Sequence, residues 1–358
     1  MASRTDRLPP WTLAAPPVAI ALDLLLQGGT GLVAGIGLAI GLIAAVLAAV
    51  HHAEVVAARL GDPFGAIVLA LAVTVIELGL IVSILLGDKP QPTLVRDTIH
   101  AVVVLVLHGL AGLCILVGAL RHREQAFRTQ GAQAYLIVLL PMVAIVLVLP
   151  NYVEGVPGPT YTTAQLAFVS VACLVLYLAF TFVQTIRDPD HFTPLGVESA
   201  VHGPRPSGRV AAGGLAMLAL SLVAVVLLAK AFSPFIQGAV AGIGAPEALV
   251  GVIVAAIVLL PEAATALRAA REDRLQTSIN LALGSAVASI GLTVPAVALI
   301  TWWQGVELTL GVTPGGAVML ALSFMMALIT YGTGRASLLS GIVHLVLLAT
   351  WVFLVVAS

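Results

Sequence analysis

The sequence predicts an all-α polytopic membrane protein with about eleven transmembrane helices. Of its 358 residues, 60% are hydrophobic and only 9% are charged, whereas a soluble domain carries roughly 25% charged residues. The mean hydropathy is +1.11. Apolar runs of about 20 residues, the length that crosses a bilayer, recur along the chain. We therefore expect the lipid bilayer to surround most of the protein.

Eleven apolar runs are candidate spans. The first is the shortest and follows Arg4 and Arg7, but Asp23 and the span that comes directly after it favour a retained anchor over a cleaved signal peptide. The longest hydrophilic connection, 186–208, follows the sixth run. The eleven runs cover residues 11–26, 31–50, 64–87, 98–119, 133–153, 162–184, 209–229, 246–266, 278–301, 313–331 and 336–357.

Lysine and arginine set the expected orientation. With a cytoplasmic N-terminus, eleven spans place 13 of the 16 Lys and Arg residues inside and leave Lys89, Arg96 and Lys230 outside. Cytoplasmic loops carry an excess of Lys and Arg. We therefore expect a multi-pass protein of the plasma (inner) membrane, with its N-terminus in the cytoplasm and its C-terminus outside.

Two spans carry a glutamate at a matching position. Glu77 follows Asp62 by 15 residues in the third span, and Glu262 follows Glu247 by 15 residues in the eighth. At about 1.5 Å per residue, each carboxylate lies about 22 Å along its helix, near the midplane of a ~30 Å core. The third span starts inside and the eighth starts outside. This pattern predicts two inverted-topology five-helix repeats after an extra N-terminal helix.

Four parts follow from this organisation. The N-terminal segment and first helix occupy 1–30, the first repeat (spans two to six) 31–185, a cytoplasmic linker 186–208, and the second, inverted repeat (spans seven to eleven) 209–358. Cys114 and Cys173 both fall in apolar runs, so we expect packing residues rather than a disulfide or a metal pair.

The two glutamates are the main candidates for binding ions. An intramembrane acid costs at least ~2.5 kcal/mol on insertion scales and marks a functional site by default, so we predict that Glu77 and Glu262 bind a cation or protons. The alternative is a structural hydrogen bond inside the bundle. Pro261 supports the functional interpretation, because proline removes a backbone donor and frees a carbonyl oxygen one turn earlier.

Other polar residues are secondary candidates. The helix after Glu262 offers Asn280 and Ser285 as oxygen donors toward a cation, although small residues there also serve helix packing. His108 is the candidate in the first repeat. His52, at the cytoplasmic end of the second span, could sense pH, with interfacial anchoring as the favoured interpretation. His344 in the last span is expected to make a structural contact.

Three blocks of the sequence resemble those of bacterial ChaA-type Ca2+/Na+:H+ antiporters, a branch of the Ca2+:cation antiporter superfamily related to the cation/proton exchangers. The blocks are HHAEVVAARLGDPFGAIVLALAVTVIELGLIVS, the pair LLPEAATALRAA and INLALGSAVASIGLTVP, and YGTGRASLLSGIVHL. The resemblance covers nearly the whole chain from the second span onward. It implies eleven spans, inverted repeats and antiport, with Glu77 and Glu262 matching the two glutamates of the family's repeat motifs.

The sequence departs from the superfamily beside both glutamates. Its exchangers usually show a Gly-Asn pair ending three residues before each glutamate, but here Val73 and Thr74 precede the first, and Val258 and Leu259 precede the second. Thr74 is therefore the only hydroxyl substitute for two absent amide oxygens. This leaves selectivity for Ca2+ open, whereas exchange itself is still expected.

The expected function is exchange of cytoplasmic Ca2+, with Na+ or K+ as further substrates, for external protons. A carboxyl group removed from water holds its proton more readily, so Glu77 and Glu262 can alternately bind protons and a cation. Carrying two bare negative charges through an occluded state would be costly, which couples the two fluxes. The alternatives are a monovalent cation/proton antiporter and, less favoured, a passive cation channel.

No enzymatic or nucleotide chemistry is expected. Neither lysine follows a glycine, so the sequence has no P-loop, and it has no His-Glu-x-x-His motif of a metalloprotease. We expect no cofactor and no nucleic-acid partner; oligomerisation stays open.

Overall fold

The computed structural model describes residues 8–26, 31–61, 64–85, 87, 91–194 and 205–357. Within these residues, ten helical segments are long and apolar enough to cross a membrane, and α1 (Pro10–Leu26), with 17 residues, is a shorter apolar helix. The predicted all-α polytopic architecture is confirmed. Arg4, Arg7, Asp62, Lys89 and part of the predicted linker lie outside the described residues.

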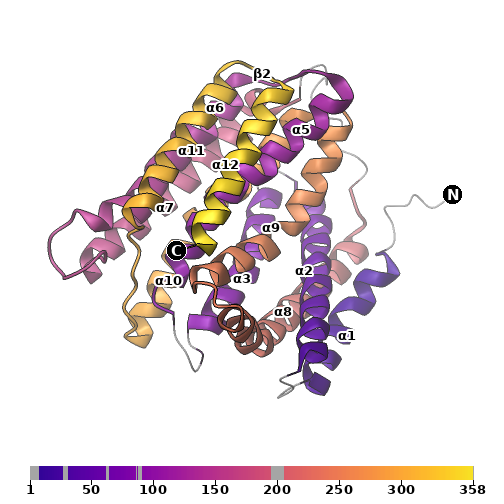
Figure 1. Cartoon of the computed structure of the whole chain (residues 1–358). Helices are drawn as coiled ribbons and strands as arrows, with labels where there is room; N and C mark the ends of the chain where they lie inside the picture. The colour runs from indigo at the N-terminus through magenta and orange to yellow at the C-terminus, as the bar shows by residue number, and fades with distance from the viewer. Residues whose placement is uncertain are drawn as a thin grey trace. The chain divides into compact units, whose positions relative to one another are not determined.

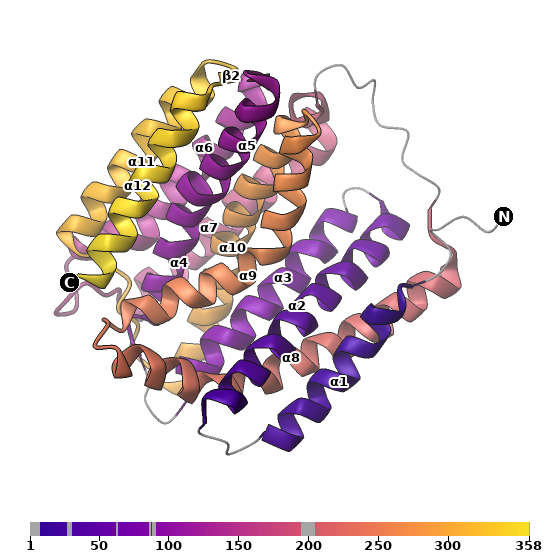
Figure 2. The ribbon, with the colours of Figure 1, turned by 45° about the vertical axis from the view of Figure 1, so that its right-hand side comes forward.

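The chain forms two compact units, and the first is built around α2. This unit comprises residues 1–91 and 201–250. Its helix α2 packs against α1, α3 and α8, and α8 packs against α1 and α3, as Figures 1 and 2 show. The bounds after α1 are α2 (Leu32–Leu60), α3 (Phe64–Leu85) and α8 (Gly208–Gly242).

The second unit comprises residues 92–200 and 251–358. One of its spans is composite: α4 (Leu94–Val104) continues through a π-helical turn (Leu105–Leu110) into α5 (Ala111–His122). The other helices are α6 (Thr129–Val143) with turns at Ala144–Val148 and Leu149–Asn151, α7 (Thr163–Phe182) with turns at Val183–Arg187 and Pro189–Phe192, α9 (Ala248–Arg271, its first three residues in the first unit), α10 (Leu275–Gln304), α11 (Pro314–Gly332) and α12 (Leu338–Val356).

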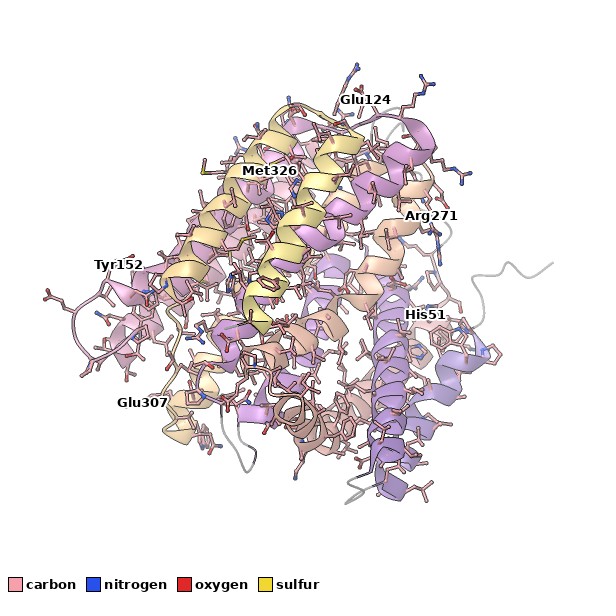
Figure 3. All side chains as sticks on the ribbon, in the orientation of Figure 1. His51, Glu124, Tyr152, Arg271, Glu307 and Met326 are labelled. Atoms are coloured by element: carbon pink, nitrogen blue, oxygen red, sulfur yellow. The ribbon has the colours of Figure 1, made fainter. Side chains whose placement is uncertain are left out.

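A short antiparallel pair of strands ties several helix ends of the second unit together. In it, β1 (Gln125–Ala126) pairs with β2 (Arg335–Ala336), and Gln125 faces Ala336. The Gln125 side chain also donates to the Ala270 carbonyl oxygen at 2.9 Å. The ends of α5, α9 and α11 therefore lie at one level. Glu124 marks this end in Figure 3, and Tyr152 and Glu307 mark the opposite end of the unit.

Two helices extend ten residues or more beyond their predicted ends. The prediction ended the second span at 50 and the seventh at 229, but α2 runs to Leu60 and α8 runs to Gly242. Both predictions stopped where hydropathy falls, although the residues that follow continue the helix. The residue that follows α2 is Gly61, whose φ of 72° is a conformation that glycine adopts without strain. His52 consequently lies inside α2 and not at its end.

The compact units do not coincide with the predicted halves. The first unit combines the N-terminal helix and two spans of the 31–185 half with α8 of the 209–358 half, and the second unit takes the remaining spans of both. Each unit thus draws on both halves of the chain. The inverted repeat itself stays a prediction.

Candidate functional site

Glu77 lies in the interior of α3 in the first unit. Thirteen residues separate it from the start of the helix at Phe64, which corresponds to about 20 Å. It is the only charged residue of this helix and its side chain is 0% exposed. A carboxylate removed from water must be neutralised by a proton, a cation or hydrogen-bond donors. This placement makes Glu77 a candidate to bind protons and cations.

Thr74 lies on the same face of α3, because residues three apart are neighbours on a helix. Its side chain is buried and its hydroxyl donates to the Ala70 carbonyl oxygen at 2.8 Å. A hydroxyl oxygen that donates its proton still has two lone pairs. Thr74 can therefore contribute one oxygen ligand beside Glu77.

A cavity of about 810 Å³ opens in the first unit between α3 and α8. Gly79 and Ser83 line it from α3, and Lys230 and Gln237 line it from α8. The exposed Glu247 stands at its rim. Because the lining begins two residues beyond Glu77, this cavity, which has both apolar and polar lining residues, reaches the helix that carries the carboxylate.

Glu262 lies in α9 at a depth similar to that of Glu77 in α3. It follows Ala248 by 14 residues, or about 21 Å, and its side chain is half-buried. Pro261 stands inside the helix without ending it. Proline has no N–H, so the Ile257 carbonyl oxygen one turn earlier loses its helical donor. The same helix therefore supplies a carboxylate and a carbonyl oxygen that a cation could use.

The hairpin of α9 and α10 places Ser285 near the level of Glu262. The Ser278 hydroxyl donates to the Ala266 carbonyl oxygen at 2.7 Å and joins the two helices. Glu262 lies four residues deeper than Ala266, and four residues deeper on α10 is Ala282, within one turn of Ser285. Ser285 is half-buried.

Asn280 is occupied in a structural network. Its amide nitrogen donates to the Phe192 carbonyl oxygen at 2.6 Å, and its amide oxygen accepts from Gln276 at 2.9 Å. The Gln276 side-chain oxygen in turn accepts from the backbone N–H of Arg128 at 2.7 Å. Asn280 thus fastens the Pro189–Phe192 turn to α10, and one lone pair of its amide oxygen is left for a cation.

His52 joins α2 to α1. Its Nε2 lies 3.0 Å from the Thr12 carbonyl oxygen, which can only accept, so Nε2 carries the proton. In α1 this carbonyl would normally accept from residue 16, but residue 16 is proline and has no N–H. His52 supplies the missing donor. Its neighbour His51, labelled in Figure 3, has its ring 6.1 Å from that of Trp11 in α1.

His108 lies in the π-helical turn and contacts residues that sequence reasoning did not assign to a site. Its Nδ1 lies 2.9 Å from Nδ1 of His344, and its Nε2 lies 2.8 Å from the Ser323 hydroxyl. The Nε2 of His344 lies 3.0 Å from the Thr330 hydroxyl. The sequence pattern that could have indicated this cluster is the seven-residue spacing of Ser323 and Thr330, which places both side chains on one face of α11.

The described residues hold no cluster of three or more His, Cys, Asp and Glu side chains that could bind a metal ion. Neither unit alone therefore presents an all-protein metal cage among these residues. Each instead presents one deep glutamate with neutral oxygen donors, in a helix that crosses the membrane. A deep glutamate beside neutral oxygen donors can bind a proton or a cation.

The chain belongs to the sodium/calcium exchanger protein family, which matches residues 30–186 and 213–357. The two matched ranges are separated by residues 187–212, which include most of the hydrophilic connection 186–208. The protein is therefore a multi-pass integral membrane protein of a cation exchanger family, as the resemblance implied.

Two relatives are similar over most of their length. The protein y4hA of Sinorhizobium fredii, whose description as an ionic transporter is provisional, is 45% identical over 318 residues, covering 87% of this chain and 86% of the relative. The sodium-potassium/proton antiporter ChaA of Escherichia coli is 31% identical over 346 residues, covering 95% of this chain and 90% of the relative.

Among solved structures, the chain is similar to YfkE, described as a Ca2+/H+ antiporter. The TM-score is 0.74 at 18% sequence identity, and the match covers 97% of this chain and 99% of that one. At this identity the likeness establishes a shared fold.

Proposed function

We propose that the protein exchanges cytoplasmic Ca2+, with Na+ or K+ as further substrates, for external protons. Glu77 and Glu262 bind the cation and the protons in alternation near the membrane midplane. The observation that carries this proposal is the pair of glutamates, each about 20 Å along its own membrane-spanning helix. With protons entering from outside, the cation is expelled from the cytoplasm.

The coupling follows from charge. An ionised carboxylate inside a membrane is expensive, so the carrier crosses only when protons or a cation neutralise the glutamates. A divalent cation or two protons can each balance two carboxylates. Binding one therefore displaces the other, and the two fluxes run in opposite directions. Thr74, Ser285 and the carbonyl oxygen freed by Pro261 complete the ligand set that we propose.

A monovalent cation/proton antiporter is the second candidate. Thr74 and Leu259 stand where the superfamily usually has asparagine, so two amide oxygens that suit Ca2+ are replaced. Calcium takes six to eight oxygen ligands and favours anionic ones, whereas a monovalent ion needs fewer charges. ChaA, at 31% identity, is a sodium-potassium/proton antiporter, which favours this candidate.

Exchange in reconstituted vesicles tests the proposal. Purified protein is inserted in liposomes that contain a pH-sensitive dye, and a gradient of Ca2+, Na+ or K+ is applied. We expect each cation gradient to drive protons in the opposite direction, and a proton gradient to drive cation uptake. Cation flux without proton movement would instead identify a passive channel, and no flux of either kind would overturn the proposal.

We further propose that the N-terminus is cytoplasmic and the C-terminus external, and cysteine labelling tests this. An impermeant thiol reagent should reach a cysteine at Ala126 from the cytoplasm and one at Val156 from outside, since both positions are exposed. In the same loop Gly158 is unsuitable for this label, because its φ of 92° would strain a cysteine. The native Cys114 and Cys173 are buried and serve as the unlabelled background. Reversed labelling would overturn the orientation.

A further inference from the structure

Four side chains of the second unit form a continuous buried hydrogen-bonded chain. Its order is Thr330, His344, His108 and Ser323, with distances of 3.0, 2.9 and 2.8 Å between successive groups. His108, His344 and Ser323 are 0% exposed and Thr330 is 4% exposed. The chain joins α11, α12 and the π-helical turn, which pack together. Helices α11 and α12 lie side by side in Figures 1 and 2.

The Ser323 end fixes the direction of every hydrogen bond in the chain. The Ser323 hydroxyl donates to the Met319 carbonyl oxygen at 2.7 Å, so it can only accept from His108. Nε2 of His108 then carries a proton and its Nδ1 accepts from Nδ1–H of His344. Nε2 of His344 in turn accepts from the Thr330 hydroxyl. The two histidines are therefore opposite neutral tautomers, each used as one donor and one acceptor.

This arrangement suits a proton and not a metal ion. The facing Nδ1 atoms are 2.9 Å apart, whereas a metal bridging two imidazoles needs about 2.0 Å to each nitrogen. A proton enters at the Thr330 oxygen, and the Thr330 hydroxyl passes its own proton to Nε2 of His344. Nδ1–H of His344 then passes to Nδ1 of His108, Nε2–H of His108 passes to the Ser323 oxygen, and the Ser323 hydroxyl releases its own proton to a water molecule. One proton enters and one leaves.

The chain leads from one end of the unit to the depth of Glu262. Thr330 lies two residues before the end of α11 at Gly332, one turn from the exposed Thr333. Ser323 lies nine residues before that end, and Glu262 lies nine residues before the end of α9 at Arg271. Both helix ends are held at one level by Gln125. The chain thus climbs about 10 Å along the unit.

Close helix packing holds the pair in place. A Cβ atom added at Gly112 of α5 would come within 2.9 Å of Cβ of His344, so only glycine permits this approach of α5 and α12. The titratable groups on the elements packed around the pair lie mostly at helix ends. They are Arg96, Asp97 and His100 on α4, Cys114, Arg121 and His122 on α5, and Tyr331 on α11.

We propose that His108 and His344 form a proton relay that connects the α11–α12 end of the second unit with the depth of Glu262. The relay rests on the proposed proton-coupled exchange and adds a route for the proton that the glutamates alone do not provide. After each passage the donors point the other way, and the hydroxyls and rings must reorient before the next proton, as in any hydrogen-bonded proton wire.

The test compares two fluxes in the same vesicles. Exchange of radioactive for unlabelled cation needs no proton, whereas cation-driven proton flux does. Glutamine in place of His108 or His344 keeps hydrogen bonding but cannot titrate. We expect each variant to lower proton flux by about tenfold or more and to keep cation self-exchange close to the wild-type rate. Thr330→Val should behave in the same way, and Thr350→Val, at an exposed threonine of α12, should change neither flux.

Other outcomes overturn the relay or the exchange separately. A parallel fall of both fluxes, or no change in either, shows that the pair is structural. If a glutamine variant does not fold, nitrogen NMR of labelled histidine in the wild-type protein provides a second test of the relay. We expect the proton on Nε2 of His108 and on Nδ1 of His344. The same tautomer for both histidines would contradict the relay. A wild-type protein without proton-coupled exchange would instead refute the proposed function.

Discussion

Replacing Glu77 by glutamine is expected to lower cation-driven proton flux by about 100-fold or more, equivalent to ~2.7 kcal/mol. Glutamine keeps the size and the hydrogen-bonding capacity of the side chain but has no charge and does not titrate. Glu77 is 0% exposed in an otherwise uncharged helix, so no nearby residue of α3 can replace it. Glu262→Gln is expected to have the same effect, measured as dye response per unit of reconstituted protein.

The controls are carboxylates outside the helix interiors. Glu247 at the rim of the first-unit cavity and Glu307 in the loop before α11 are changed to glutamine in the same way. Both variants should exchange at close to the wild-type rate. Size-exclusion profiles and thermal unfolding should show that all four variants fold. Wild-type flux in Glu77→Gln or Glu262→Gln would remove that residue from the mechanism.

The rate of cation self-exchange distinguishes the glutamate variants from the variants of His108 and His344. The glutamates are proposed to bind the cation as well as the proton, so Glu77→Gln should reduce self-exchange together with proton flux. His344→Gln should reduce proton flux alone. The two residues are therefore distinguished by which of the two fluxes they change.

The spans could be predicted because a bilayer imposes a length of about 20 apolar residues on each of them. The same rule ended two helices ten residues or more too early. Lys230 lowers the hydropathy at the predicted end of the seventh span, yet α8 continues to Gly242 because backbone hydrogen bonding does not require apolar side chains. Hydropathy reports where lipid can surround a helix, and not where the helix stops.

The positions of Glu77 and Glu262 inside helices could be predicted because a single charge in a long apolar run is evident from the sequence alone, whereas their role in binding ions stays a prediction. The partners of the histidines could not be predicted. His52 replaces a donor that Pro16 removes from α1, and His108 meets His344 across 236 positions of sequence. Such pairings depend on which helices pack together and in which register, and no local pattern encodes them.

Thr74→Asn is expected to shift the preference between Ca2+ and Na+ by about tenfold toward Ca2+, equivalent to ~1.4 kcal/mol. Thr74 lies one turn before the buried Glu77, on the same face of α3. Its hydroxyl already donates to the Ala70 carbonyl oxygen, so it offers lone pairs from a fixed position. Asparagine offers a longer side chain and an amide oxygen, the type of neutral ligand that Ca2+ takes beside carboxylates.

The measurement uses both cations against protons in the same vesicles, for the wild-type protein, Thr74→Asn and Thr74→Val. Valine keeps the branched shape of threonine and removes the oxygen, so it should weaken Ca2+ exchange more than Na+ exchange, because Ca2+ requires more ligands than Na+. Thr265→Asn is the matched control. The Thr265 hydroxyl also donates to a carbonyl oxygen of its own helix, that of Pro261 in α9 at 3.1 Å. Thr265 is exposed, unlike Thr74. If neither change at Thr74 alters the Ca2+ to Na+ preference, its side chain does not reach the ion, and the cation ligands contributed by α3 reduce to Glu77.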